Sequence, residues 1–445
     1  MVVAVTVAAL AFGSCRANPS RKSVVLIVVD TLGANHLGAY GYQRPTSPNL
    51  DAWAASGRLF ERAFATSPWT LPSFGSIYTG RFPSRHGTGV MVETRRGRRK
   101  PGGMHTRVRT LAEILSESGY ATGAIVNNPF LAPEFGVARG FASYDYVPGS
   151  ATNIRRADVV VDRALAWIDR LRGEPYFLLV HFFDPHLNYD APKPFRGRFS
   201  REYRSKLTIP VHGIGAIRSG RLALADSDRH FIGAAYDEEI AFVDQQLGRL
   251  REGLTARGVL RRGLVVLTSD HGEELFEHGG FEHGHAMWQE LLHVPMVFWG
   301  DGVLPGREMA PVSLVDLAPT ILEAAGSAPH QPLEGLSLWA NLTAGAPVPA
   351  RTLYAEGTLY GAEQKAAIRW PHKVVIDMQR TAPRLFDLDL DPHETSDAAA
   401  SRPKLAAQLV ADLAAKLQAA RRAALIPAPL KAETREKLRA LGYLK

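Results

Sequence analysis

Continuous runs of apolar, β-branched residues recur along the chain and alternate with stretches of helical periodicity. Runs of this kind are typical of strands buried on both faces of a parallel sheet. The runs cover residues 23–29 (SVVLIVV), 121–126, 176–183 (YFLLVHFF), 263–269 (GLVVLTS) and 294–299 (VPMVFW). Helices are expected between or after them at residues 51–56, 111–118, 158–171, 229–254, 314–325, 403–422 and 433–445. The alternation predicts an α/β fold with a largely parallel sheet and helices on both faces.

Three of these strands end in acidic residues or histidines. Residues 23–29 stop at Asp30, residues 263–269 stop at Asp270-His271, and the YFLLVHFF run is followed by Asp184-Pro185-His186. In parallel sheets, ligands bind at the carboxyl ends of the strands. A single aspartate after a strand usually serves a turn or a helix cap. Three such ends favour a functional site at one edge of the sheet.

A further candidate lies in the segment TSPWTLPSFGSIYTG, residues 66–80. Pro72 suits the first turn of a helix, where its missing N–H costs nothing. Thr70 would then lie at or beside the start of that helix. The free N–H groups and the dipole of a helix N-terminus suit a phosphoryl or sulfuryl group. The alternative is that Thr70 is only an N-cap.

Composition narrows the class of protein. The chain has 445 residues, of which 46% are hydrophobic and 22% are charged, and its net charge is +8. This balance excludes a disordered chain, a collagen and a polytopic membrane protein. The modest positive surplus favours anionic substrates, and we expect no nucleic-acid partner. The single cysteine, Cys15, excludes an internal disulfide and a cysteine-based catalytic site in the folded body.

The first residues predict export. The uncharged stretch MVVAVTVAALAFGS is shorter than the roughly 20 residues of a membrane-spanning helix and matches the apolar part of a secretory signal. Cys15 follows Gly13-Ser14, in a pattern similar to a bacterial lipoprotein cleavage site. We therefore expect residues 1–22 to be a leader and linker, and the protein to be periplasmic or on the outer surface. Membrane attachment through a lipidated Cys15 and a plain cleavable signal are the alternatives.

Several segments, in order, resemble the sulfatase family of the alkaline phosphatase superfamily. They are VVLIVVDTLGANHLGAYGY, TSPNLDAWAASG, TLPSFGSIYTGRFPSRHG, HFFDPHLNY, TSDHGEELFEHGGFEHGHAMW, LFDLDLDPHETSD and LRALGYL. The resemblance implies an alkaline phosphatase-like α/β sandwich with a large mixed, mostly parallel sheet. It further implies a catalytic domain over residues 23–350. Residues 351–445 would form a small C-terminal α+β subdomain with antiparallel strands and terminal helices.

The chain departs from the sulfatase pattern at two places. Sulfatases carry a Cys or Ser that becomes formylglycine, in a motif like Cys-x-Pro-Ser-x-Arg, where this chain has Thr70-Leu71-Pro72-Ser73-Phe74-Gly75. Their Gly-Lys-Trp-His stretch is replaced by Val126-Asn127-Asn128-Pro129. The pattern is closer to relatives with a threonine nucleophile, which include nucleotide phosphodiesterases, phosphoethanolamine transferases and lipoteichoic acid synthases.

Residue chemistry agrees with a threonine site that uses a divalent metal. An alcohol is a weak nucleophile at neutral pH, and a bound cation stabilises its alkoxide. Asp30, Asp270 and His271 would hold the metal, with Thr70 as the fourth ligand. Two carboxylates, an imidazole and an alkoxide favour Zn²⁺ or Mn²⁺, with Ca²⁺ or Mg²⁺ as alternatives.

The resemblance assigns the remaining roles to histidines. His186 and His283 would bind the ester oxygens or protonate the leaving group, which makes both of them catalytic and substrate-binding candidates. His285 competes with His283 for this role. Asn128 is a further substrate-binding candidate, for which packing within a loop is the alternative. His278 is a candidate for a second metal together with Asp184.

Three other segments are expected to be structural. Residues 236–250 should form a core helix with Asp237 and Asp244 on its polar side. Asp387 and Asp389 should lie in a turn of the C-terminal subdomain. The basic segment from Glu93 to Gly103 should be a surface loop, or else a rim that attracts an anionic substrate.

The function predicted from the sequence is an exported, metal-dependent hydrolase of sulfate, phosphate or phosphonate esters, with Thr70 as nucleophile. The substrate would be an anionic ester on a small molecule, a glycan or a lipid head group. One alternative is a transferase that moves a phospho-substituent onto an envelope glycan or lipid. A second is a catalytically inactive surface protein that binds glycans.

Overall fold

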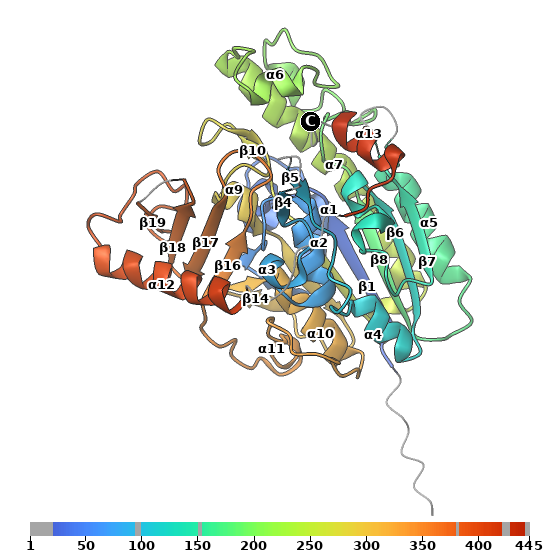
Figure 1. The fold of residues 1–445 in the computed structure, drawn as a ribbon. Coiled ribbons are helices and arrows are strands. Elements are labelled where there is room, and N and C mark those ends of the chain that lie inside the picture. The colour runs from blue at the N-terminus through green and yellow to red at the C-terminus, as the bar shows by residue number, and fades with distance from the viewer. Residues whose placement is uncertain (1–20, 94–98, 150–153, 380–381, 421–427, 441–445) are drawn as a thin grey trace, which may run out of the picture.

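The structure, a computed structural model, describes residues 21–93, 99–149, 154–379, 382–420 and 428–440 (Figure 1). The predicted leader with Cys15 lies outside the described residues, as do the last five residues of the expected terminal helix. None of the described helices is long and apolar enough to cross a membrane.

The central sheet has eight strands in the order β14-β2-β13-β9-β1-β8-β6-β7. They are β1 (Val24–Val29), β2 (Arg58–Phe60), β6 (Ala121–Asn127), β7 (Ser143–Val147), β8 (Tyr176–Phe182), β9 (Leu264–Ser269), β13 (Met296–Gly300) and β14 (Gly306–Glu308). β13 pairs antiparallel with both of its neighbours, and all other pairings are parallel. The predicted large, mixed and mostly parallel sheet is therefore confirmed.

Helices cover both faces of this sheet (Figure 1). All six residues of β1 are buried, and alternate side chains point to opposite faces. Val25, Ile27 and Val29 share a core with residues of α1 (Pro48–Ala54), α5 (Ala157–Asp169) and α7 (Asp226–Ala256). Val24, Leu26 and Val28 point to the other face and share a second core with α2 (Thr70–Thr79), α4 (Leu111–Glu117) and α10 (Leu317–Ala324). The continuous apolar run of the sequence reflects this two-sided burial.

The C-terminal subdomain contains the predicted antiparallel sheet, formed by four strands: β16 (Leu353–Glu356), β17 (Gln364–Arg369), β18 (His372–Asp377) and β19 (Arg384–Asp387). Helix α12 (Pro403–Ala420) packs Leu409 and Leu413 against this sheet. Helix α13 (Ala432–Ala440) lies apart from it, beside the short 3-10 turn at Pro129–Leu131 (Figure 1).

Shorter elements complete the described chain. The short helices are α3 (Pro83–His86), α6 (Ile214–Arg218), α8 (Val259–Arg262), α9 (Gln289–Leu292) and α11 (Trp339–Ala344). The short strands are β3 (Ala63–Phe64), β4 (Met91–Glu93), β5 (Arg99–Pro101), β10 (Glu274–Leu275), β11 (Phe281–Glu282), β12 (His293–Val294) and β15 (Val312–Ser313). β4 pairs with β5. The segment expected as a surface loop from Glu93 to Gly103 therefore belongs in part to a hairpin.

The long helix of the predicted core is α7, but its two aspartates do not lie on a solvated side. Asp237 and Asp244 are both buried. The Asp237 carboxylate accepts hydrogen bonds from the hydroxyl of Tyr42 (2.7 Å) and the guanidinium of Arg44 (2.5 Å). The Asp244 carboxylate accepts the backbone N–H of Leu50 at the start of α1 (2.8 Å). Both carboxylates thus anchor the segment that follows β1.

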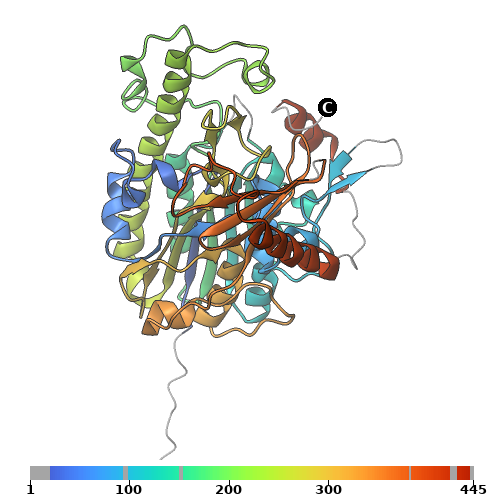
Figure 2. The ribbon, with the colours of Figure 1, turned by 90° about the vertical axis from the view of Figure 1, so that its left-hand side faces the viewer.

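A long insertion, residues 184–225, joins β8 to α7. It carries α6 and lies beyond the carboxyl ends of the strands, at the top of Figures 1 and 2. α6 contacts β11 of the β10–β11 hairpin. The insertion therefore reaches the edge of the sheet at which the sequence places its candidate residues.

Candidate active site

The register of the sheet brings two candidate carboxylates to the same level. Val29, the last residue of β1, pairs with Phe182 of β8 and with Ser269 of β9. The residues that follow β1 and β9 are Asp30 and Asp270, and both are fully buried. The prediction that strand ends gather acidic residues at one edge therefore agrees with the structure.

Asp30, Asp270 and His271 form a group whose ligand atoms all lie within 4.8 Å of one another. Nε2 of His271 is 3.3 Å from Oδ2 of Asp270 and 3.7 Å from Oδ1 of Asp30. It is also 3.3 Å from Oγ1 of Thr70. The structure thus brings together the four residues that the sequence predicts as metal ligands.

The hydrogen bonds of His271 prepare Nε2 for a metal. Nδ1 lies 2.9 Å from the carbonyl oxygen of Gly272. A carbonyl only accepts, so Nδ1 carries the proton and Nε2 keeps its lone pair. Burial lowers the pKa of His271, which favours this neutral form. A neutral imidazole with a fixed tautomer is the form that coordinates metal ions.

The two carboxyl groups also fit a cation. Burial, and then the neighbouring Asp30 carboxylate, raise the pKa of Asp270 well above its usual value. Burial also acts to raise the pKa of Asp30, but a hydrogen bond from His181 and the nearby His186 and His271 rings bring it below the usual value. Oδ1 of Asp30 and Oδ2 of Asp270 are buried without a hydrogen-bond partner. A divalent cation between these oxygens would satisfy both and allow both groups to be ionised.

Thr70 is the first residue of α2, one position inside the helix start that the sequence predicts. Trp69 precedes it in extended conformation, and Pro72 occupies the first turn as expected. The Thr70 side chain is buried, and its hydroxyl lies 3.3 Å from both Nε2 of His271 and Nδ2 of Asn128. Its hydroxyl is therefore aimed at the predicted metal group.

Asn128, at the carboxyl end of β6, connects the nucleophile candidate to a ligand candidate. Its Nδ2 donates to Oδ2 of Asp30 (2.6 Å) and to Oγ1 of Thr70 (3.3 Å), while its Oδ1 accepts the N–H of Phe130 (2.8 Å). Its φ of +116° is a conformation that non-glycine residues rarely adopt. Such strain persists only where the surroundings hold it, as these three contacts do. These contacts place Asn128 beside Asp30 and Thr70, and its role in substrate binding stays a prediction.

His181 is a residue of this site that the sequence analysis missed. It lies within β8 and is fully buried. Its Nδ1 accepts the N–H of Asn127 (3.3 Å), so a neutral ring carries its proton on Nε2, which is 3.4 Å from Oδ2 of Asp30. The ring packs edge-on against Phe74 of α2. The signal in the sequence is a histidine inside the apolar run YFLLVHFF, where water cannot form hydrogen bonds with its ring nitrogens.

His186 and His283 lie next to the metal group. Each is 3% exposed, and their ring centroids are 5.1 Å apart. The His283 ring is 4.5 Å from that of His271, and the His186 ring stacks on Phe183. Burial lowers the pKa of both imidazoles. Both histidines therefore lie beside the predicted metal group, and their role in binding the ester stays a prediction.

Glu273, which the sequence analysis did not single out, orients His283. Its Oε1 lies 2.8 Å from Nδ1 of His283, and its Oε2 accepts the hydroxyl of Tyr189 (3.2 Å). His285 is tied instead to the next carboxylate, with Nε2 2.6 Å from Oε2 of Glu274. The two histidines that compete in the sequence thus have different partners.

His278, predicted as a partner of Asp184 in a second metal site, lies beside two other acidic residues. Nε2 of His278 lies 3.4 Å from Oε2 of Glu290, and these two residues form a possible ligand group with Glu394 rather than with Asp184. The buried Nζ of Lys373 lies 2.7 Å from Oε1 of Glu394, so this group already contains a cation.

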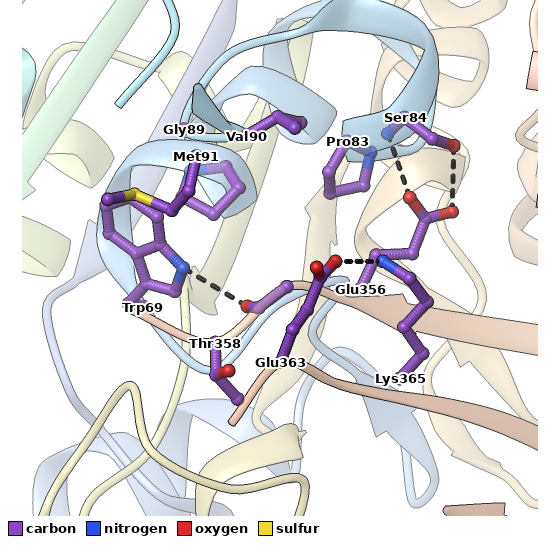
Figure 3. A pocket seen from close by; sticks show the side chains of 12 residues that line it. Trp69, Pro83, Ser84, Gly89, Val90, Met91, Glu356, Thr358, Glu363 and Lys365 are labelled. Atoms are coloured by element: carbon purple, nitrogen blue, oxygen red, sulfur yellow. Dashed lines mark hydrogen bonds and ion pairs between the residues drawn. The ribbon is translucent and has the colours of Figure 1, made fainter. Parts of the chain in front are cut away.

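The C-terminal subdomain supports the segment that carries Thr70. The carbonyl oxygen of Gly357 accepts the indole N–H of Trp69 (3.2 Å) and the hydroxyl of Ser67 (3.0 Å). The Glu356 carboxylate accepts the N–H and the hydroxyl of Ser84. Figure 3 shows the contacts of Trp69 and Ser84 around a cleft between α3 and β16. Residues far from Thr70 in sequence thus hold the segment that leads into α2.

Comparison with known proteins identifies the family. Residues 22–327 match the model of the family described as Sulfatase. Arylsulfatase A from Homo sapiens is 28% identical over 390 residues, which cover 78% of this chain and 72% of that protein. The chain therefore belongs to the sulfatase family and is a hydrolase of that family.

Solved structures share the fold. A 2-O GAG sulfatase superposes with a TM-score of 0.73 at 18% identity, covering 92% of this chain and 96% of that one. The phosphonate monoester hydrolase of Agrobacterium radiobacter gives a TM-score of 0.71 at 21% identity, covering 90% and 96%. The same fold is thus found in proteins named for different esters.

We expect Asp270→Ala to abolish binding of a divalent metal, because it removes one of three converging ligands. We expect His181→Ala to weaken binding by about 10- to 100-fold, the range for a residue that orients a ligand. Metal content and affinity, measured by mass spectrometry and chelator competition, test both. His86→Gln changes a buried histidine bonded to Ser76 outside the group, and should bind metal like the wild type. Unchanged metal content in Asp270→Ala would contradict the site.

Proposed function

We propose that this protein hydrolyses phosphodiesters or phosphonate monoesters in preference to sulfate esters, with Thr70 as the nucleophile. The observation that carries the proposal is the Thr70 hydroxyl, which lies 3.3 Å from Nε2 of His271 within the Asp30–Asp270 group. The Thr70 hydroxyl by itself would supply the attacking oxygen. Asp30, Asp270, His271 and Thr70 would hold the divalent cation, for which the donor set favours Zn²⁺ or Mn²⁺.

A cation bound there would stabilise the alkoxide of Thr70 and neutralise charge on the ester oxygens. The chain contributes the rest of the arrangement. The start of α2 directs its backbone N–H groups and positive dipole towards an anion. Asn128 holds the threonine oxygen and the Asp30 carboxylate in fixed relation.

The identity of the nucleophile supports phosphorus over sulfur. The hydrate of formylglycine can expel sulfate by elimination, which regenerates the aldehyde. An esterified threonine lacks that route, so water must attack the bound phosphorus or sulfur atom to free it. Relatives that resemble this chain at Thr70 perform that step at phosphorus. The fold itself does not decide, because it is shared by a sulfatase and a phosphonate monoester hydrolase.

His186 and His283 serve the ester rather than the metal. The Thr70 hydroxyl gives up its proton to solvent when the alkoxide forms. As the alkoxide oxygen bonds to phosphorus, the bond from phosphorus to the leaving oxygen breaks, and that oxygen takes a proton from one of these imidazoles in its protonated form. The same group then accepts a proton from the water that attacks phosphorus and frees Thr70. Because Glu273 contacts Nδ1 of His283, the other ring nitrogen, Nε2, would exchange the proton.

The substrate test compares kcat/KM for a phosphonate monoester, bis-p-nitrophenyl phosphate, p-nitrophenyl phosphate and p-nitrophenyl sulfate. We expect the first two to be the best substrates. Thr70→Ala should remove all turnover, whereas Thr70→Ser should retain part of it, because only the hydroxyl is required. A clear preference of the wild type for the sulfate ester would overturn the proposal.

For the two histidines, we expect His186→Ala and His283→Ala each to lower the rate by about 10²–10⁴, the range for a positioned acid or base. Metal content should remain that of the wild type, since neither is a ligand in this proposal. His285→Ala provides the comparison, because its ring is bonded to Glu274, and its rate should fall less. Loss of metal from His186→Ala or His283→Ala would show that the assigned role is wrong.

We further propose that the protein is exported and carries a lipid on Cys15. The support is the apolar stretch before Gly13-Ser14-Cys15. Full-length protein made in bacteria should then partition into detergent, and Cys15→Ser should release it into the aqueous phase. Mass spectrometry of a mature N-terminus beyond Cys15, without lipid, would rule out the anchor.

A further inference from the structure

Three segments that lie far apart in sequence meet at the side chain of Arg218. Arg218 ends α6, in the insertion that lies beyond the strand ends. Its Nε donates to Oε2 of Glu282 on β11, the residue directly before His283. Its guanidinium carbon lies 4.6 Å from the ring centre of Tyr360, in the C-terminal subdomain. The backbone N–H of Tyr360 in turn donates to the carbonyl of Gly284 (3.0 Å), the residue directly after His283.

Arg218 acts electrostatically on the candidate active site. The pKa of His283 is lowered first by burial, then by the neighbouring His271 and His186, and then by the positive charge of Arg218. Its charge also opposes the burial that raises the pKa of Glu282 and of Glu273. Among the causes resolved for these three groups, Arg218 is the one permanently charged cation. It therefore supplies positive potential beside His283 at any physiological pH.

Arg218 is more exposed to solvent than the buried centre of the site. Thr70 and His283 are 1% and 3% exposed, whereas the side chain of Arg218 is 21% exposed. The side chain of His285, two residues past His283, is 25% exposed. A guanidinium has five N–H donors in a planar fork, so one that serves Glu282 can also donate to an oxyanion.

We propose that Arg218 forms a substrate-recognition site with Tyr360, selecting esters that carry a second anionic group, such as a carboxylate, next to the scissile ester. This inference rests on the proposed function, because the ester must lie at Thr70. The aromatic ring of Tyr360 provides a flat surface under the guanidinium and limits its orientation. The insertion of residues 184–225 thereby contributes directly to specificity.

The test measures binding rather than turnover, so that it does not depend on the chemistry. Metal-loaded Thr70→Ala protein is titrated by calorimetry with two phosphodiesters, phenyl p-nitrophenyl phosphate and its 3-carboxyphenyl counterpart. We expect the carboxylated ester to bind more tightly. Arg218→Gln should remove that preference, a loss of about 10- to 100-fold corresponding to one hydrogen bond between charged groups. Arg218→Lys should retain part of it, since it keeps the charge but not the fork.

Two further variants separate recognition from structure. Arg218→Gln leaves Glu282 buried without its partner, so the double variant Arg218→Gln/Glu282→Gln removes both charges and should fold more stably. If Arg218 recognises the anion, this double variant still lacks the preference for the carboxylated ester. Arg221→Gln, which changes an exposed arginine bonded to Ser219 in the same insertion, should bind both esters like its Thr70→Ala parent.

The outcomes distinguish this inference from the proposed function. Equal affinity of the Thr70→Ala parent for the two esters would overturn the inference. So would recovery of the preference in the double variant, because Arg218 would then only neutralise Glu282. Neither result concerns the proposed function, which fails instead if wild-type protein does not hydrolyse phenyl p-nitrophenyl phosphate.

Discussion

The structure depends on one electrostatic constraint, the burial of two carboxyl groups at the ends of neighbouring parallel strands. Asp30 and Asp270 leave the sheet at the same level, both without exposure to solvent. In a medium of low dielectric constant, two such groups cannot both be ionised unless positive charge or hydrogen-bond donors compensate them. Asn128 donates to Asp30, whose Oδ2 also lies 3.4 Å from Nε2 of His181, and backbone N–H groups donate to Asp270, yet one oxygen of each carboxylate remains without a partner. The side chains around Asp30 and Asp270 therefore only partly compensate the two buried carboxylates.

Much of this arrangement could be predicted from the sequence, because strand ends are local features. A run of apolar residues that stops at Asp30 or at Asp270-His271 shows both the strand and the edge where ligands gather. His181 could not be found in this way, since its role depends on the strand that lies beside its own. Asp237 and Asp244 were misplaced for a related reason. An acidic residue on an amphipathic helix usually faces water. Only the tertiary structure shows that these two carboxylates are buried and accept hydrogen bonds from N–H and O–H groups of residues 42–50.

The comparison with other members of the family separates what the fold provides from what individual residues decide. In this chain the sheet brings the two carboxylates and the start of α2 together, and we propose that they form a site for anionic esters. The chemistry at that site depends on which atom begins α2 and on what lies at the end of β6. In this chain those positions hold the Thr70 hydroxyl and the amide of Asn128. An amide carries no charge. The segment before α7 contributes a charged side chain, Arg218, which is bonded to Glu282, the residue directly before His283.

The contacts of Gly357 with Ser67 and Trp69 have a consequence for the order in which the chain is assembled. The segment just before Thr70 takes part of its hydrogen bonding from a carbonyl that is synthesised about 290 residues later. Asp30 and Asp270 are likewise separated by most of the large domain. Contacts of such long range form late, because a long loop must close before they bring any gain. A growing chain that has not yet reached the C-terminal subdomain therefore holds the Thr70 segment without these anchors, and the complete site arises only in the finished molecule.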